Sequence, residues 1–163
     1  MTTDTDLLQR FLFEGAGVRG EFVRLDSSFR ALLDRHDYPP AIARQLGKAL
    51  ASVALLSATI KLEGSLILQI QGDGRMHTLV AQADSKGGIR GLARWRGEVA
   101  NHNLTLSELA GKGHIVMTID AEGKGPVLIF SGADTTTSIV GLTIRGATGG
   151  AVQLKNSAPR FSN

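Results

Sequence analysis

Residues 39–62 read PPAIARQLGKALASVALLSATIKL, and this stretch decides the fold. It opens on two prolines, which suit the first turn of a helix because an N–H group there would stay unpaired anyway. Apolar residues then recur at helical steps of three and four. They are Ile42, Leu46, Ala49, Leu50, Val53, Leu56 and Ile60. The second half, Ala49–Ile60, carries no charge. We therefore predict a long buried central helix over about residues 40–62, too short in its charge-free part for the ~20 residues of a membrane span.

Length and composition indicate one globular domain. The chain has 163 residues, of which 42% are hydrophobic and 20% charged, as in an ordinary globular protein. Its 18 basic and 15 acidic residues leave a net charge of only +3, whereas a dedicated nucleic-acid binder usually concentrates basic charge. Cysteine is absent, which excludes disulfides and thiol catalysis. The N-terminus, MTTDTD, is acidic and unlike a secretory or transit signal, so we expect a cytoplasmic location without membrane contact.

Strand patterns flank the predicted helix on both sides. The predicted strands are 10–14, 19–25, 65–71, 75–83, 89–96 and 114–120. Residues 27–37 read as a short helix capped by Ser27 or Ser28, and the spacing of Thr105 and Glu108 predicts a second one at 105–110. Strands and helices do not alternate regularly. The pattern therefore predicts an α+β fold, with a mostly antiparallel sheet packed around the central helix.

The composition changes near residue 126. Residues 126–163 contain a single acidic residue, Asp134, and are rich in glycine, serine and threonine. We predict a core domain over 1–125, followed by a divergent C-terminal segment over 126–163 that could complete the sheet. Strand-like runs are expected at 127–130 and 139–145, and a frayed end at 156–163.

No motif indicates catalysis. Gly15–Gly20 spells G-x-G-x-x-G, but a strand-like run follows it where a dinucleotide site needs a helix. Ala110–Gly113 resembles part of a phosphate-binding loop, yet it lacks both the upstream glycine and a hydroxyl residue after Lys112. The four histidines, at 36, 77, 102 and 114, are not at metal-ligand spacing. We therefore predict that the protein is not an enzyme and has neither a metal site nor a cofactor.

One face of the 89–96 strand is basic. It carries Arg90, Arg94 and Arg96, which could contact RNA or another phosphate compound. The alternative is an ordinary solvated sheet face balanced by Glu98 or Asp84. The aromatic platforms of sequence-tolerant nucleic-acid binders are missing, so we do not expect nucleic acid as the main partner.

Several longer stretches, in this order and spacing, resemble the heat shock protein 33 family. They are RFLFEGAGVRGEFVRLD at 10–26, YPPAIARQLGKALASVALLSATIKLEGSLILQIQGDG at 38–74, LVAQADSKGGIRGLARW at 79–95 and LTLSELAGKGHIVMTID at 104–120. The resemblance spans roughly residues 6–125. The family comprises redox-regulated holdase chaperones of the bacterial cytoplasm. The resemblance implies an N-terminal α+β domain that binds unfolding proteins, and usually a homodimer.

The resemblance also implies a C-terminal zinc domain whose cysteines form the redox switch. Because this chain has no cysteine, we expect neither the zinc site nor the switch, and client binding that needs no oxidant. A holdase needs exposed apolar area. The candidate client-binding residues are Leu66, Leu68, Ile70, Ile89 and Trp95. Alternation shows that their strands have two faces without showing which face is exposed, so packing against the central helix is the open alternative.

Overall fold

The computed structural model describes residues 5–60 and 64–121, together with five short strands between residues 128 and 162. The helices are α1 (Ser27–Leu33), α2 (Pro40–Ile60) and α3 (Leu106–Ala110). The longer strands are β1 (Leu7–Phe13), β2 (Val18–Arg24), β3 (Gly64–Gly72), β4 (Met76–Asp84), β5 (Ile89–Trp95) and β6 (Gly113–Ala121). The short strands are β7 (Leu128–Ser131), β8 (Ser138–Val140), β9 (Leu142–Arg145), β10 (Val152–Lys155) and β11 (Arg160–Ser162).

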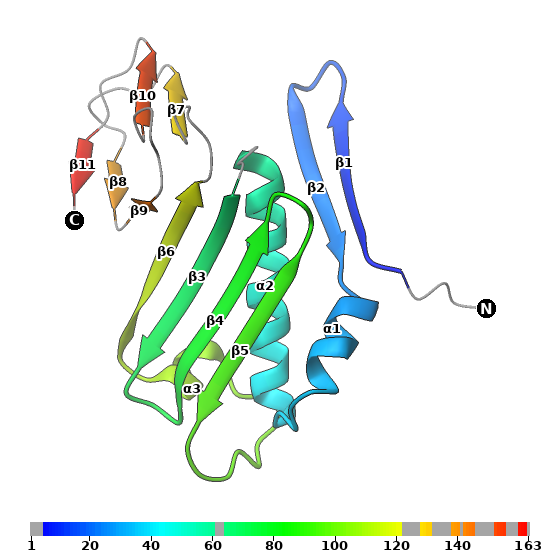
Figure 1. Ribbon diagram of the computed structural model, residues 1–163, viewed down its shortest axis with the longest axis vertical. Helices are drawn as coiled ribbons and strands as arrows, with labels where there is room; N and C mark the ends of the chain where they lie inside the picture. Colours follow the sequence, from blue (N-terminus) through cyan, green and yellow to red (C-terminus); the bar gives the residue numbers. More distant parts are fainter. Residues whose placement is uncertain are drawn as a thin grey trace.

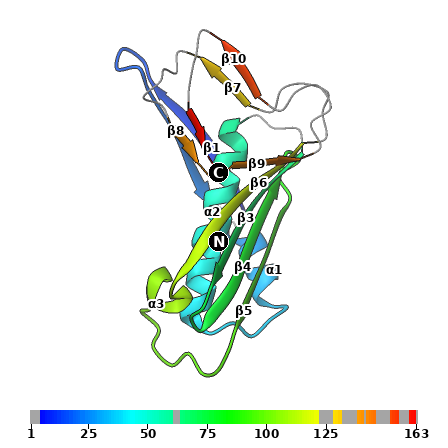
Figure 2. The same ribbon diagram turned by 90° about the vertical axis from the view of Figure 1, so that its left-hand side faces the viewer.

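The main sheet has the strand order β5-β4-β3-β6-β9. The β3–β4, β4–β5 and β3–β6 pairs are antiparallel, and only β9 joins in parallel, on the free edge of β6. A separate antiparallel hairpin is formed by β1 and β2. Figures 1 and 2 show α2 lying along one face of the main sheet, with the hairpin projecting beside the C-terminal end of the helix. The predicted α+β fold with a mostly antiparallel sheet is confirmed.

The hydrophobic core lies between α2 and the main sheet. Fully buried side chains of the helix, among them Leu46 and Leu50, pack in one cluster with Leu66 of β3, Leu79 of β4 and other sheet residues. Lys48 and Ser52, on the opposite side of α2, are exposed. The sheet thus covers one side of the helix. The described helix ends at Ile60, and the last two residues of the predicted range lie outside the described residues.

Two helix starts are capped in different ways. In α3 the predicted capping box is confirmed, since the Thr105 side chain accepts from the Glu108 N–H and the Glu108 carboxylate accepts from the Thr105 N–H. In α1 the expected cap at Ser27 or Ser28 is wrong, because the N-cap residue is Asp26. The backbone N–H groups of Asp26 and Ser28 at this helix start donate to the carboxylate of Asp6, which lies before the helix in the chain. The Asp26 nitrogen is 2.6 Å from Asp6 Oδ1.

The segment after residue 126 forms further strands. β7 overlaps the first expected run, and β8 and β9 divide the second between them. The expectation of a frayed end at 156–163 is wrong at its last part, because β11 pairs in parallel with β8. β7 pairs in parallel with β10. The division into a core over 1–125 and a C-terminal segment stays a prediction.

Candidate functional site

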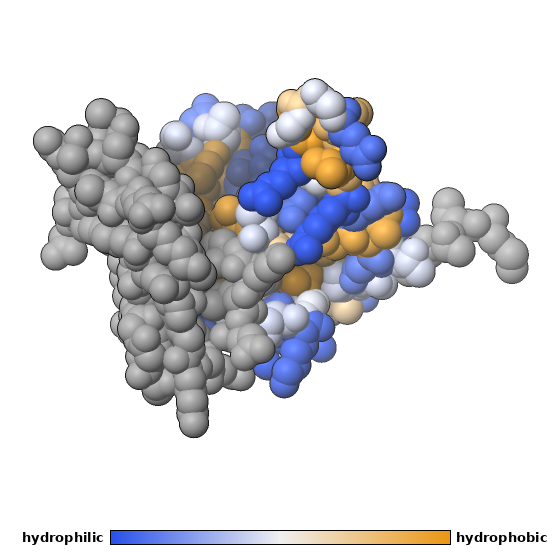
Figure 3. All heavy atoms as spheres, turned by 90° about the horizontal axis from the view of Figure 1, so that it is seen from above, coloured by the Kyte–Doolittle hydropathy of each residue, from blue (hydrophilic) through white to orange (hydrophobic). Residues whose placement is uncertain are grey.

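The β1–β2 hairpin carries most of the exposed apolar side chains of the described residues. Its most exposed members are Leu12 at 63%, Phe13 at 59% and Phe22 at 53%. We call this set the hairpin apolar surface; it comprises Leu7, Leu8, Phe11, Leu12, Phe13, Val18 and Phe22. Outside it, the only other large hydrophobic side chain exposed in the described part of the chain is Ile115 of β6. Seen from above, orange apolar groups lie among blue polar ones on the side of the molecule where the hairpin projects (Figure 3).

Aromatic side chains gather on one face of the hairpin. Phe11 and Phe13 lie two residues apart on β1, so they share a face, and the register places Gln9 of the same face opposite Phe22. The rings of Phe11 and Phe13 make an edge contact, with centroids 5.6 Å apart. Phe11 lies opposite Gly20, and a Cβ atom at position 20 would overlap its ring. A glycine is therefore required there for the Phe11 ring to lie over the neighbouring strand.

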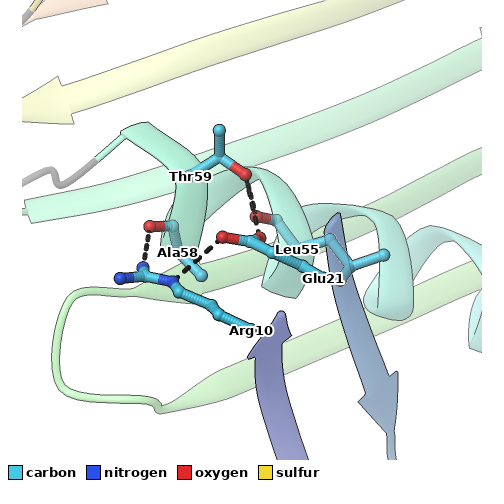
Figure 4. A network of polar contacts seen from close by, with 5 residues as sticks. All are labelled: Arg10, Glu21, Leu55, Ala58 and Thr59. Atoms are coloured by element: carbon cyan, nitrogen blue, oxygen red, sulfur yellow. Dashed lines mark hydrogen bonds and ion pairs between the residues drawn. The ribbon is translucent and has the colours of Figure 1, made fainter. Parts of the chain in front are cut away.

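A polar network fastens the middle of the hairpin to α2 (Figure 4). Arg10 Nε lies 3.0 Å from Glu21 Oε1 on the paired strand, and the same guanidinium donates to the Ala58 carbonyl of the helix. The Thr59 hydroxyl lies 2.9 Å from the other Glu21 oxygen and 2.9 Å from the Leu55 carbonyl. One ion pair thus links both strands to the last turn of α2 and leaves the hairpin tip, residues 11–19, unfastened.

The base of the hairpin is held by the start of α1. The Asp6 carboxylate accepts hydrogen bonds from the backbone N–H groups of Asp26 and Ser28, and Arg24 donates to the Thr5 carbonyl. Burial alone would raise the pKa of Asp6, but the hydrogen bonds from Ser28 and from the Asp26 amide outweigh it and lower the pKa. The ionised form of Asp6 is therefore the one that holds the hairpin base in place.

A cavity of about 400 Å³ lies where the hairpin, α2 and the β4–β5 turn meet. Its apolar wall includes Leu8, Val23 and Ala58, and its polar rim includes Asp6, Arg10 and Asp84. Arg10 and Asp6 are already engaged as described, and Asp84 accepts from the N–H groups of its own turn. The cavity can accept an apolar group, and these three charged side chains already have partners within the chain.

The structure separates the five predicted client-binding residues. Leu66 and Ile70 are buried in the core, at 0% and 6% exposure, on the face of β3 that meets α2. Leu68, Ile89 and Trp95 are half-buried and pack against the same core, and the Trp95 ring lies 5.6 Å from that of Tyr38. All five side chains therefore take part in the core between α2 and the main sheet, as in the alternative that the sequence left open. Their part in client binding stays a prediction.

The predicted basic face lies on the surface. Arg90, Arg94 and Arg96 are exposed, and none forms an ion pair with the described acidic residues. No ion pair joins Asp84 or Glu98, the counter-charges of the alternative interpretation, to these arginines in the described residues. Arg90 also borders a hollow of about 380 Å³ with Arg35 and His36.

Other kinds of site are not visible in the described residues. They contain no group of three or more histidine, aspartate or glutamate side chains that could hold a metal ion. No helix among them is both long enough and apolar enough to cross a membrane. Gly15 and Gly17 of the G-x-G-x-x-G run lie in the hairpin turn, with φ of 85° and 62°, and the run leads directly into the strand β2 where a dinucleotide site needs a helix. The fold and its surface thus define a class of protein: an α+β domain whose most distinctive surface feature, among the described residues, is the hairpin apolar surface.

Comparison with known proteins identifies the family within that class. The family model described as Hsp33 protein matches residues 6–137, twelve residues beyond the stretch in which the sequence resemblance is recognisable. The chain belongs to the Hsp33 family. Similar proteins are named 33 kDa chaperonin. That of Nitrosococcus oceani is 56% identical over 121 residues, and those of Vibrio vulnificus and Shewanella loihica are 44% identical over 116 and 114 residues.

These matches cover 74%, 71% and 70% of this chain but only 41%, 40% and 40% of the three relatives. The chain therefore spans about two fifths of the length of the curated relatives that it matches. What the relatives do as whole proteins is consequently a proposal for this chain.

Sequence reasoning missed the hairpin apolar surface, although a signal for it exists. The strand LLQRFLF has apolar residues at both odd and even positions, so neither of its faces can be wholly polar. A two-stranded hairpin cannot bury both faces by itself. This combination indicates exposed apolar area wherever the rest of the chain does not cover the hairpin.

Proposed function

We propose that the protein is an ATP-independent molecular chaperone, a holdase that binds unfolding proteins through the hairpin apolar surface. The observation that carries this proposal is the concentration of seven exposed large hydrophobic side chains on one hairpin. Concentrations of exposed apolar side chains mark protein interaction sites. Membership of the Hsp33 family and the chaperonin name of the relatives support the same function.

The chemistry of the surface suits non-specific capture. Burying apolar area against a client is favourable by roughly 25 cal/mol per Å² and requires no particular sequence in the client. Phenylalanine side chains offer large contact area, and the proposed step consumes no nucleotide because binding alone prevents aggregation. Since the 163 residues contain no cysteine, we propose capture that is independent of oxidant and of zinc. A cytoplasmic location and a homodimer are part of the same proposal.

The test is a light-scattering aggregation assay with a thermally unfolding client. The wild-type chain should suppress scattering equally with and without peroxide. The double variant F11S/F13S should lose most of this protection, whereas I115S, which removes an exposed apolar side chain elsewhere, should keep it. Equal protection by F11S/F13S and the wild type would refute the role of the hairpin. Protection that appears only after oxidation would refute the redox-independent part.

A second candidate function is binding of RNA or another phosphate compound through Arg90, Arg94 and Arg96. It is favoured by their exposure without an ion pair to any described acidic residue. Binding through phosphates weakens steeply as salt rises, whereas apolar capture responds little. A salt titration of RNA affinity, with the variant R90Q/R94Q as comparison, distinguishes the two functions.

A further inference from the structure

The outer edge of β1 is an open strand edge. In the described part of the chain β1 pairs only with β2, within a two-stranded sheet, and β2 is the strand next to α2 (Figure 1). In an antiparallel pair alternate residues direct their N–H and C=O groups to the partner, and the others direct them away. Along one side of β1, backbone donors and acceptors are therefore available to a further strand.

This edge lacks the usual protection against pairing. Natural edge strands carry prolines, lysines, bulges or charges that keep other chains away. β1 reads LLQRFLF, with neither proline nor lysine, and its register with β2 runs without a bulge from Leu7 to Phe13. Its one charge, Arg10, is held by Glu21 and by the Ala58 carbonyl. All seven residues are exposed.

We propose that β1 binds an extended segment of an unfolded polypeptide as a third strand of the hairpin sheet, an inference that rests on the proposed holdase function. Main-chain hydrogen bonds supply sequence-tolerant binding in this mode, and side chains on alternate positions supply the preference. The added strand would lie beside Leu8 and Leu12 on one face and beside Phe11 and Phe13 on the other. Each face of β1 carries apolar side chains and one polar residue, Arg10 on one face and Gln9 on the other, and Arg10 is engaged by Glu21 and Ala58. Apolar side chains are thus offered on both faces, so the preferred segment is continuously apolar.

Such segments distinguish unfolded proteins from folded ones. An exposed antiparallel strand alternates apolar and polar residues, whereas a strand buried on both faces reads as a continuous apolar run. Continuous runs lie in the interior of folded proteins and are reachable only after unfolding. The pattern of β1 thus selects clients by their state of folding.

The other conceivable occupant is β1 of a second copy. Antiparallel self-pairing with full overlap of the two strands places Arg10 directly opposite Arg10, at the centre of the seven-residue strand. Like charges directly opposite each other destabilise strand pairing. Arg10 is also tied to α2 and cannot turn away without losing the network in Figure 4. We therefore favour a client segment over a second copy.

The test uses peptides that share their side chains and differ in backbone donors. The parent peptide has seven consecutive apolar residues, flanked by lysines for solubility. Two derivatives carry N-methyl groups on one or the other set of alternate residues. The peptide whose methyl groups block the N–H groups that face β1 should bind at least about tenfold more weakly than the parent. The peptide methylated on the other alternate residues should bind within about twofold of the parent. A composition-matched peptide that alternates apolar and polar residues should bind more weakly than the parent.

Residue-resolved amide hydrogen exchange locates the bound strand. Binding of the parent peptide should slow exchange at alternate residues of β1 and leave the β2-paired residues unchanged. If both methylated peptides bind equally while F11S/F13S still abolishes aggregation protection, strand addition is refuted and the holdase function stands. If no peptide binds and no client is protected, both proposals fail. Slowed exchange of the β1 edge without peptide, in a chain that sediments as a dimer, would assign the edge to a second copy.

Discussion

Arg10 of β1 and Glu21 of β2 face each other across the hairpin with 3.0 Å between Nε and Oε1, and both also contact the last turn of α2. This pair lies between the anchored base of the hairpin and its exposed tip. It therefore holds the middle of the hairpin against α2.

Glu21→Gln should loosen the hairpin without unfolding the domain. The Arg10 side chain is 53% exposed, so solvent screens the pair and its loss should lower the free energy of unfolding by less than about 1 kcal/mol. Amide exchange at Gln9–Leu12 should nevertheless accelerate. Glu14→Gln, the same change in the hairpin turn, is the matched control. Equal exchange in both variants would show that the pair does not fasten the hairpin.

Leu66→Ala and Leu12→Ala should differ strongly in their effect on stability. Leu66 is fully buried, so its truncation leaves a cavity and should lower the free energy of unfolding by about 2–5 kcal/mol. Leu12 is 63% exposed, and its truncation should change stability by less than about 0.5 kcal/mol. Denaturant unfolding measures both values. A stable L66A protein with reduced client binding would instead return Leu66 to the client-binding surface.

Gly72→Ala should destabilise the end of the main sheet. The β3–β4 turn packs closely on α3, and a Cβ atom at position 72 would overlap the Ala110 carbonyl oxygen. A backbone atom cannot rotate out of the way, so we expect a loss of about 1–3 kcal/mol in thermal unfolding. Gly47→Ala is the control: its Cβ would lie 3.0 Å from the end of the flexible Phe29 ring, and alanine favours the helix. Equal stability of the two variants would contradict this contact.

Acid should release the base of the hairpin. The pKa of Asp6 is lowered from its ordinary value of 3.8, so the ionised carboxylate stabilises the folded state. This contribution is present above pH 3.8, and it is lost as the pH falls through the lower folded-state pKa. Amide exchange at Ser28, followed against pH, should show the loss.

Asp6→Asn should remove this pH dependence, since the amide does not titrate. Asp37→Asn, at an exposed carboxylate between α1 and α2, should leave it unchanged. A pH profile of Asp6→Asn that still falls on the acid side would show that another group is responsible.

The sequence by itself determined the central helix, the longer strands and the start of α3, but neither the cap of α1 nor the strand β11 near the C-terminus. Helical spacing in 39–62 predicts α2, alternation predicts the strands, and the Thr105–Glu108 pair predicts the start of α3, because each depends on residues close together in the chain. The family was recognisable from the same stretches.

Only the tertiary structure decided which surfaces are exposed. Alternation in β3 defines two faces, and the packing of α2 makes the face with Leu66 and Ile70 the interior. The apolar side chains of the hairpin lie outside this core and stay exposed. The cap of α1 by Asp6, twenty residues before its partner Asp26, is likewise a contact that no local pattern contains. Burial is a property of what packs against a segment, and that partner lies far away in the sequence.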